Sequence, residues 1–219
     1  MSDKEISTIQ KLYQVLIDHY GPQGWWPILD LQDEGINPTK RGKFTGYHPG
    51  DYTIPRNENT AFEIMLGAIL TQNTSWVNAE KALADLSKES KLTPSTIRDI
   101  DQEDLGKIIR SSGYYNQKAT RLHILCAFLK QNPIKKLHQI FTPVLRKKLI
   151  KIKGIGPETA DSILLYALKR PSFVVDAYTK RLLSRFGISD PSWKYKNYQD
   201  FFHRVYQPIK ENVPVYNEY

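Results

Sequence analysis

The residue best suited to chemistry in this sequence is Asp176, which follows the apolar pair Val174-Val175 and opens an amphipathic run. A carboxylate in such a place can stabilise positive charge that develops on a reacting carbon, and it can orient or deprotonate a water molecule. The alternative is an ordinary helix N-cap, because aspartate is a favoured capping residue and a helical pattern follows. One side chain can fill both roles, so the sequence alone leaves both open.

A glycine turn lies upstream of this aspartate. Gly154-Ile155-Gly156 follows an apolar helical pattern and precedes Pro157, which suits the first position of a second helix because its missing N–H costs nothing there. Glycines permit positive φ angles and let the backbone approach a partner closely, and the free N–H groups at a helix start bind anions. Together these features are the pattern of a helix–hairpin–helix that binds a DNA phosphate, with Lys151 and Lys153 beside it.

Positive charge is unevenly distributed along the chain. The formal net charge of +8 favours polyanions, with nucleic acid first and an acidic membrane surface second. No acidic residue lies between Asp104 and Glu158. A solvated helical face would explain such a run, but we interpret it as a phosphate-binding surface that ends at the glycine turn. Its cations are Lys107, Arg110, Lys118, Arg121, Lys130, Lys135, Lys136, Arg146, Lys147, Lys148, Lys151 and Lys153.

The amino-acid composition limits the classes of protein to which this chain can belong. The chain has 219 residues, 40% of them hydrophobic, which is enough for one large or two small domains with a core. Its one cysteine, Cys126, excludes a disulfide framework and a four-cysteine iron–sulfur cluster within this chain, and we expect it in the core. No uncharged run approaches the roughly 20 residues of a transmembrane helix, and no signal core follows Met1. We therefore expect a soluble, cytoplasmic protein.

Helical periodicity dominates, and we predict no β-sheet. Ser75 and Thr93-Pro94 provide helix-start signals. Residues 30–58 are rich in turns and predict a long surface loop or insertion. The predicted helices cover 2–20, 60–70, 76–87, a segment from Pro94, 101–110, 116–131, 142–152, a segment from Pro157, 177–187 and 194–210.

The hairpin, the helix after it and Val174-Val175-Asp176 resemble the signature of the helix–hairpin–helix DNA glycosylase superfamily, to which endonuclease III belongs. Residues 70–74 (LTQNT) and 112–119 (SGYYNQKA) are similar to further motifs of that superfamily. Gly24-Trp25-Trp26-Pro27 resembles the start of the endonuclease III-like branch that includes 3-methyladenine DNA glycosylase III. The resemblance covers about 20–27 and 59–188, but not the loop at 30–58.

The resemblance implies an all-α fold in two lobes around a central six-helix barrel. We expect an N-terminal helix and insertion loop at 1–59, packing with the C-terminal lobe. The barrel would cover 60–170, with the helix–hairpin–helix at 143–169, and the C-terminal lobe at 171–219 would carry the catalytic aspartate. Family members continue past the position of Tyr219, and many then carry an iron–sulfur cluster. We expect the C-terminal end to be missing here, with Asn217-Glu218-Tyr219 starting a further helix.

The resemblance also implies site residues. Asp176 matches the catalytic aspartate, and Glu158 stands where lyase members carry a nucleophilic lysine. A carboxylate cannot form a Schiff base, so the implied activity is base removal without strand cleavage. Trp25, Trp26 and Pro27 match residues of the base pocket. Gln72 matches the side chain that enters the duplex. The expected DNA contacts are Gln72, Asn73, Lys151, Lys153, Gly154, Gly156, Glu158 and Thr159, and the carbonyls expected to hold a monovalent cation at the hairpin are those of Ile150, Ile152 and Ile155.

These implications predict a DNA glycosylase of base excision repair that removes alkylated purines such as 3-methyladenine and leaves an abasic site. Such a base is already cationic and departs neutral, so a carboxylate and tryptophan faces suffice. The alternatives are an endonuclease III-like glycosylase for another lesion, a lyase with an unmatched amine, or a non-catalytic DNA-binding module. We expect no required cofactor, damaged double-stranded DNA as the partner, no membrane association and a monomer.

Overall fold

The computed structural model describes residues 3–32, 36–40 and 42–218, and within them every regular element is helical. An isolated bridge between Ile36 and Tyr47 is the one β-type pairing in those ranges. The prediction of an all-α fold is therefore confirmed. Within the same ranges, no helix combines the length and apolar character needed to cross a membrane.

Most predicted helices form, and two differences have simple physical reasons. The helix predicted at 194–210 ends at Val205, since Pro208 cannot continue a helix and disfavours helical geometry in the residue before it. The helix Ile134–Leu137 was not predicted, because four residues are too few to show a helical period. The helix expected to start at Asn217 starts instead at Val213, so Asn217 and Glu218 are its last described residues. The α-helices are α1 (Asp3–Tyr20), α2 (Glu58–Leu70), α3 (Trp76–Glu89), α4 (Pro94–Asp99), α5 (Gln102–Ile108), α6 (Tyr115–Gln131), α7 (Ile134–Leu137), α8 (Thr142–Ile150), α9 (Pro157–Ser162), α10 (Ala177–Arg185), α11 (Tyr195–Val205) and α12 (Val213–Glu218).

Four shorter segments complete the described chain. Three are 3-10 turns, η1 (Leu29–Leu31), η2 (Arg110–Ser112) and η4 (Lys210–Asn212). The fourth, η3 (Ile163–Ala167), continues α9 with π-helical geometry. The helix-start signals are confirmed: the hydroxyl of Ser75 accepts the amide of Asn78 at 3.4 Å, and that of Thr93 accepts the amide of Thr96 at 3.2 Å.

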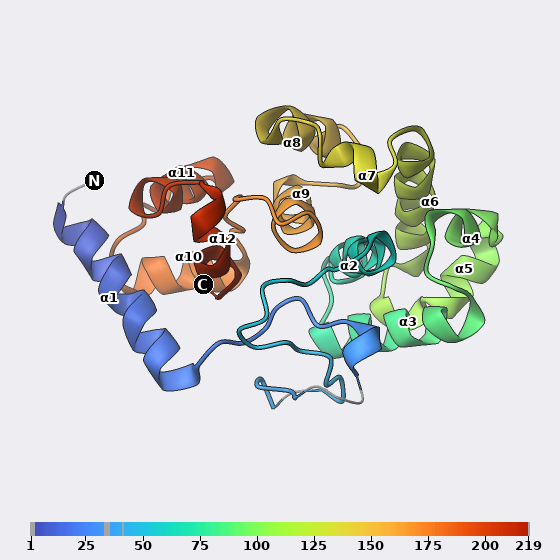
Figure 1. The fold of residues 1–219 in the computed structure, drawn as a ribbon, viewed down its shortest axis with the longest axis horizontal. Coiled ribbons are helices and arrows are strands. Elements are labelled where there is room, and N and C mark those ends of the chain that lie inside the picture. Colours follow the sequence, from blue (N-terminus) through green and yellow to red (C-terminus); the bar gives the residue numbers. More distant parts are fainter. Residues whose placement is uncertain (1–2, 33–35, 41, 219) are drawn as a thin grey trace.

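Two hydrophobic clusters organise the molecule. Figure 1 shows the helices as two groups, with α1, α10, α11 and α12 to the left of α9 and α2–α7 to its right. The first surrounds α2, every residue of which is buried from Thr60 to Leu70, and it extends through α3–α9 to Leu168. The second joins α10, α11 and α12 to Ile9 of α1 and to Leu165 of η3. The chain before α2 contributes to both clusters. Trp26, Ile28 and Ile54 pack in the first cluster, and Ile9 packs in the second. The domain boundaries at 59 and 170 stay predictions.

A buried carboxylate joins the two lobes. Asp161 of α9 is fully buried and forms a two-point ion pair with Arg146 of α8, at 2.7 and 2.8 Å. It also accepts the hydroxyls of Ser172 at 2.6 Å and of Tyr195 of α11 at 2.7 Å. Burial and the charge of Asp161 raise the pKa of Tyr195. The Tyr195 oxygen in turn accepts the amide of Val175 at 3.3 Å, so this network supports the residue that precedes Asp176.

Two cations of the acid-free interval do not belong to a phosphate-binding surface, so that part of the prediction is wrong. Arg146 is engaged by the buried carboxylate of Asp161. Lys118 is fully buried, and its ammonium donates to the carbonyls of Leu70 at 2.8 Å and Ser112 at 2.6 Å. It therefore stabilises the carboxyl ends of α2 and η2. Burial and the charge of Arg121 lower the pKa of Lys118 to about 8.

The predicted loop at 30–58, of which residues 33–35 and 41 lie outside the described residues, holds the tryptophan segment against α2. The amide of Ile28 donates to the carbonyl of Gly46 at 3.0 Å. The imidazole Nε2 of buried His48 lies 2.9 Å from the carbonyl oxygen of Trp26. The carboxylate of Glu63 on α2 accepts the amide of Leu29 at 2.7 Å.

Glu63→Gln is expected to stabilise the protein at alkaline pH. Burial is the main cause that raises the pKa of Glu63 from 4.5 to about 7, with the charge of Asp30 adding to it. A raised folded-state pKa means that the stabilising contribution is present below pH 4.5 and lost as pH rises through 7. The advantage of the variant in free energy of unfolding should therefore grow from near zero to about 1–3 kcal/mol at alkaline pH. Urea unfolding across this pH range measures it.

The matched control is Glu58→Gln, an exposed position on the first turn of the same helix. It should change the free energy of unfolding by less than about 0.5 kcal/mol at every pH. If Glu63→Gln shows a pH-independent difference from the wild type, the buried carboxyl does not titrate with folding and the prediction is wrong.

Candidate active site

The hairpin between α8 and α9 has the geometry expected of a glycine turn. The amide of Ile155 donates to the carbonyl of Ile152 at 3.0 Å, and Gly156 caps α9 ahead of Pro157. Gly154 has a φ of +91°, and a Cβ there would lie 2.4 Å from Cγ of Arg121. Gly156 has a φ of −87°, and the space where its Cβ would point is open. Gly154 is thus required by conformation and packing, whereas Gly156 leaves the backbone accessible to a partner.

Gln72 is bound to this hairpin. Its amide nitrogen donates to the carbonyl of Gly154 at 3.0 Å and to the hydroxyl of Thr159 at 2.9 Å. Its amide oxygen accepts the guanidinium of Arg121. The next residue, Asn73, is exposed with a φ of +51°, a conformation that asparagine tolerates. These bonds join the end of α2 to the turn, so a Gln72 side chain that enters DNA would first have to leave them.

The predicted DNA-contact residues gather around the hairpin but differ in exposure. Lys151, Lys153 and Glu158 are exposed, whereas Thr159 is 7% exposed and turned toward Gln72. The three backbone carbonyls predicted to hold a cation lie in or beside the same turn, at Ile150, Ile152 and Ile155. Among the described residues, no three His, Cys, Asp or Glu side chains gather so as to hold a metal.

Asp176 is the N-cap of α10. One carboxylate oxygen, Oδ1, accepts the amide of Thr179 at 2.7 Å, so the capping role is confirmed. Among the described residues this amide is the only donor to the carboxylate, which leaves Oδ2 for a water molecule or a substrate. The side chain is half-buried. Capping and a catalytic role are therefore compatible in this geometry.

Glu158, at the position expected of a lyase lysine, lies within electrostatic reach of Asp176. Partial burial of its carboxyl group and the negative charge of Asp176 raise the pKa of Glu158, while the ammonium of Lys180 acts in the opposite direction. Asp176 and Lys180, at the start of α10, thus lie within electrostatic range of Glu158 in the first turn of α9. Lys180 was not among the predicted site residues, because its distance along the sequence from the hairpin gives no signal.

An aromatic cluster surrounds the tryptophan pair. Trp25 is half-buried and Trp26 is buried, and the Trp76 ring lies 5.0 Å from the first and 5.2 Å from the second, both edge-on. Tyr166 of η3 lies 5.5 Å from Trp26. Burial and then the charges of Asp176 and Glu218 raise the pKa of Tyr166, so this ring lies within electrostatic range of the Asp176 carboxylate.

The backbone of α2 leaves room for this cluster. A Cβ at Gly67 would lie 2.9 Å from the indole nitrogen of Trp26, so glycine is what lets the ring lie against the helix. Pro27 is buried beside it. Trp76 and Tyr166 were missed by sequence reasoning, because each sits in an ordinary amphipathic pattern whose apolar residues all predict core positions.

Lys151→Ala and Lys153→Ala are each expected to weaken binding to duplex DNA regardless of its sequence. Both side chains are exposed beside the accessible backbone of Gly156. Losing one phosphate contact should flatten the slope of log K against log [salt] by about one. Fluorescence anisotropy at several salt concentrations measures this slope. Lys88→Ala, at the exposed end of α3, should leave it unchanged, and an unchanged slope in both hairpin variants would contradict the assignment.

Residues 66–208 match the family model described as "HhH-GPD superfamily base excision DNA repair protein". The chain belongs to this family. The matched range includes the hairpin, Glu158 and Asp176, together with the end of α2 that carries Gln72. The predicted superfamily is therefore confirmed, and the helical fold described above is the HhH-GPD glycosylase fold.

Curated relatives within this superfamily share much of the chain. A protein of Methanocaldococcus jannaschii, named as the DNA repair glycosylase MJ1434, is 37% identical over 223 residues, which cover 100% of this chain and 86% of that protein. Endonuclease III of Thermotoga maritima is 31% identical over 136 residues, covering 61% of each chain.

Solved structures agree with the fold. The 3-methyladenine DNA glycosylase MagIII of Helicobacter pylori, bound to 1,N6-ethenoadenine, is 28% identical with a TM-score of 0.64, over 94% of this chain and 83% of that one. An endonuclease III–DNA complex is 20% identical with a TM-score of 0.67, over 97% and 82%, and this likeness concerns the fold alone. The family is described as base excision DNA repair proteins, which makes DNA the class of partner expected of this chain.

Proposed function

We propose that this HhH-GPD protein is a monofunctional DNA glycosylase that hydrolyses the N-glycosidic bond of alkylated purines such as 3-methyladenine, leaving an abasic site. The observation that carries the proposal is the aromatic cluster of Trp25, Trp26, Trp76 and Tyr166, in which Tyr166 lies within electrostatic range of Asp176. The similarity to MagIII, which binds 1,N6-ethenoadenine, supports an adenine adduct as the substrate.

The chemistry follows from the charges of the reacting groups. The target base must leave the helical stack, because its reacting sugar carbon is otherwise inaccessible. Loss of the base builds positive charge on the deoxyribose, and the Asp176 carboxylate stabilises that charge and orients the attacking water. A 3-alkylated adenine is already cationic and departs as a neutral base, so no general acid is needed. An indole face attracts such a cation by roughly 0.5–2 kcal/mol.

Glu158 supports base removal without strand cleavage, since a carboxylate cannot form a Schiff base with the sugar. The second candidate is a glycosylase with lyase activity, and the amine that favours it is Lys180. This ammonium lies near enough to Glu158 for its charge to affect that carboxyl group. A free amine at this place could attack the sugar if it lost its proton.

The deciding experiment incubates the protein with duplexes that carry 3-methyladenine, 1,N6-ethenoadenine, 8-oxoguanine or an oxidised pyrimidine. The proposal expects release of the alkylated adenine, with strand breaks only after alkali. Strand breaks before alkali, or an adduct trapped by borohydride, would show a lyase, and Lys180→Ala would then test whether this amine forms it. Release only from the 8-oxoguanine or pyrimidine duplex would reject the alkylpurine assignment. No release from any duplex would favour a binding module.

We also propose that Gln72 fills the space left by the base, and that the carbonyls of Ile150, Ile152 and Ile155 hold a monovalent cation. The carbonyl of Ile152 accepts the amide of Ile155 at 3.0 Å and keeps a second lone pair, so the donor set fits. The cation would supply positive charge beside a DNA phosphate. We propose a monomer in the cytoplasm, and sedimentation equilibrium tests the oligomeric state.

A further inference from the structure

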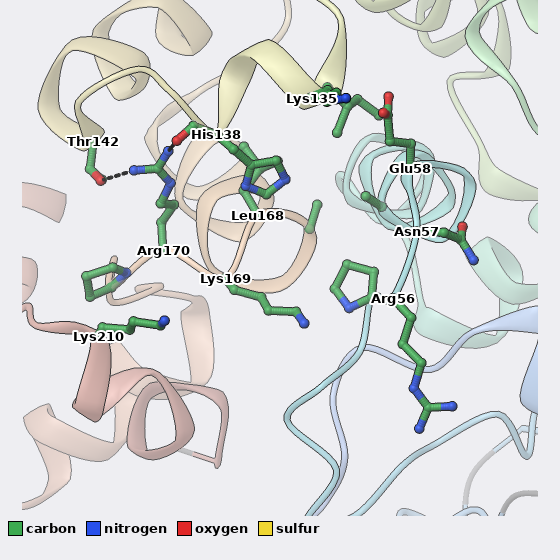
Figure 2. A pocket seen from close by; sticks show the side chains of 15 residues that line it. Arg56, Asn57, Glu58, Lys135, His138, Thr142, Leu168, Lys169, Arg170 and Lys210 are labelled. Carbon is green, nitrogen blue, oxygen red and sulfur yellow. Dashed lines mark hydrogen bonds between the residues drawn. The ribbon is translucent and has the colours of Figure 1, made fainter.

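A cavity of about 580 Å³ opens at the amino-terminal end of α2 (Figure 2). Its walls come from four segments: residues 55–58 before and within α2, residues 134–142 around α7, the turn at 167–171 after η3, and Lys210 of η4. The volume lies within the range of small-molecule sites. The proposed glycosylase reaction uses none of these residues.

The walls of this cavity are strongly cationic. One carboxylate, Glu58, belongs to the lining, and a second, Asp51, pairs with a lining arginine, Arg56, at 2.7 Å. The cationic side chains come from each of the four segments, as Figure 2 shows. They are Arg56, Lys135, Lys169, Arg170 and Lys210, with His138 among them.

These charges are close enough to affect one another. Burial lowers the pKa of Lys169, and the charges of Arg56 and Lys210 lower it further against the opposing charge of Asp51. Burial likewise lowers the pKa of His138, and the charges of Arg170 and Lys169 lower it further, whereas the negative charge of Glu58 raises it. The cavity therefore concentrates positive charge beyond what its own carboxylates compensate, and a bound anion would relieve this repulsion.

Part of the cavity is held in a fixed arrangement. The Arg170 guanidinium donates to the hydroxyl of Thr142 at 3.1 Å and to the carbonyls of Leu137 and His138 at 3.2 and 2.6 Å. Lys169 has a φ of +51°, and its ammonium donates to the carbonyl of Thr53. These bonds fix the positions of two positive charges, and ordered charges bind an anion with a smaller entropic cost than free surface side chains do.

The cavity and the hairpin lie at opposite ends of the same helices. α2 begins at the cavity with Glu58, and the residues after it reach the hairpin through Gln72. α9 and η3 run the other way, from Pro157 at the hairpin to Ala167 at the cavity. The 13 residues of α2 span about 20 Å. A duplex bound at the hairpin therefore approaches the other end of α2.

We propose that this cavity binds the oligophosphate chain of a small soluble anion, inorganic or carried by a nucleotide. Five cations from four segments are more than a single phosphate can contact, and a chain of several phosphates would contact more of them. Two of the five are arginines, whose planar guanidinium suits phosphate oxygens.

Titration calorimetry on the whole chain tests this with tripolyphosphate, ATP, adenosine and orthophosphate at constant ionic strength. Tripolyphosphate should bind at least 10-fold more tightly than orthophosphate, and adenosine should not bind. The double variant Lys135→Glu/Lys210→Glu should weaken tripolyphosphate at least 10-fold. The exposed control Lys88→Glu should change it less than twofold. If the double variant does not fold, the single variant Lys210→Gln should still weaken binding at least threefold.

The remaining outcomes are equally informative. Equal affinity of ATP and tripolyphosphate supports recognition of the phosphate chain alone, and at least 10-fold tighter ATP supports a nucleotide. If Lys88→Glu weakens binding as much as the double variant does, the protein attracts polyanions in general and the proposal is overturned. If undamaged duplex displaces tripolyphosphate, the cavity is a DNA-backbone site and the proposal is likewise overturned. Base release by the Lys210→Gln variant should stay within twofold of wild type, and its loss would place the cavity on the DNA path.

Discussion

Asp176→Asn is expected to lower the rate of base release by at least about 10²-fold, the cost typical of losing one group that stabilises transition-state charge. The substitution removes the negative charge but keeps an oxygen at the position that accepts the Thr179 amide at 2.7 Å. Asparagine is as good an N-cap as aspartate, so α10 should stay folded. Single-turnover kinetics on an alkylated duplex measures the rate, and anisotropy measures DNA binding, which should change little.

The chain offers a matched control in Asp101, which caps α5 through the amide of Glu103 at 2.8 Å. Asp101→Asn makes the same chemical change at another helix start, and it should leave base release within twofold of wild type. If Asp176→Asn retains a rate within about fivefold, the carboxylate is not the group that stabilises the sugar. The capping role would then be its only one.

Asp161→Asn should reduce the free energy of unfolding by about 3–5 kcal/mol, the cost of breaking a buried ion pair by removing one partner. Arg146 would keep its charge beside a site that no longer has a compensating carboxylate. The hydroxyls of Ser172 and Tyr195 would lose an anionic acceptor. Urea unfolding measures the loss. Base release should also fall, because Tyr195 supports the amide of Val175 next to Asp176.

A surface pair provides the comparison. Asp200 pairs with Lys196 one turn away on α11, with 48% and 81% of their side chains exposed. Asp200→Asn should therefore cost no more than about 1 kcal/mol. A loss below 1 kcal/mol in Asp161→Asn would mean that the buried network does not hold the lobes together. Normal base release in a destabilised Asp161→Asn protein would separate its structural role from the positioning of Asp176.

Local sequence was sufficient wherever a short signal carries its own physical reason. Pro157 after Gly156 predicted the start of α9, and the capping residues Ser75 and Thr93 predicted two more helix starts. Hydrophobic periodicity predicted the long helices, because burying one face requires apolar residues at a helical spacing. The same reasoning failed for α7 and for the end of α11, where the segment was too short or a proline intervened.

Charge was the property that the sequence described least well. Lys118, Arg146 and Lys135 belong to one acid-free run, yet they have three different environments: a buried helix end, a buried ion pair and the cationic cavity. The sign of a charge is local, but its solvation depends on which distant segments surround it. Lys118 is fully buried because Leu70 and Ser112, far apart in sequence, both present carbonyls to it.

By itself, the sequence determined an all-α chain with a helix–hairpin–helix, an aspartate downstream and no lysine at Glu158. Each of these depends on residue type and short spacing, which are local quantities. Tertiary structure alone decided that Gln72 binds both the hairpin and Arg121, that Trp76 and Tyr166 pack on the tryptophan pair, and that Asp161 joins the lobes. These contacts join segments distant in sequence, and their formation depends on how the helices pack.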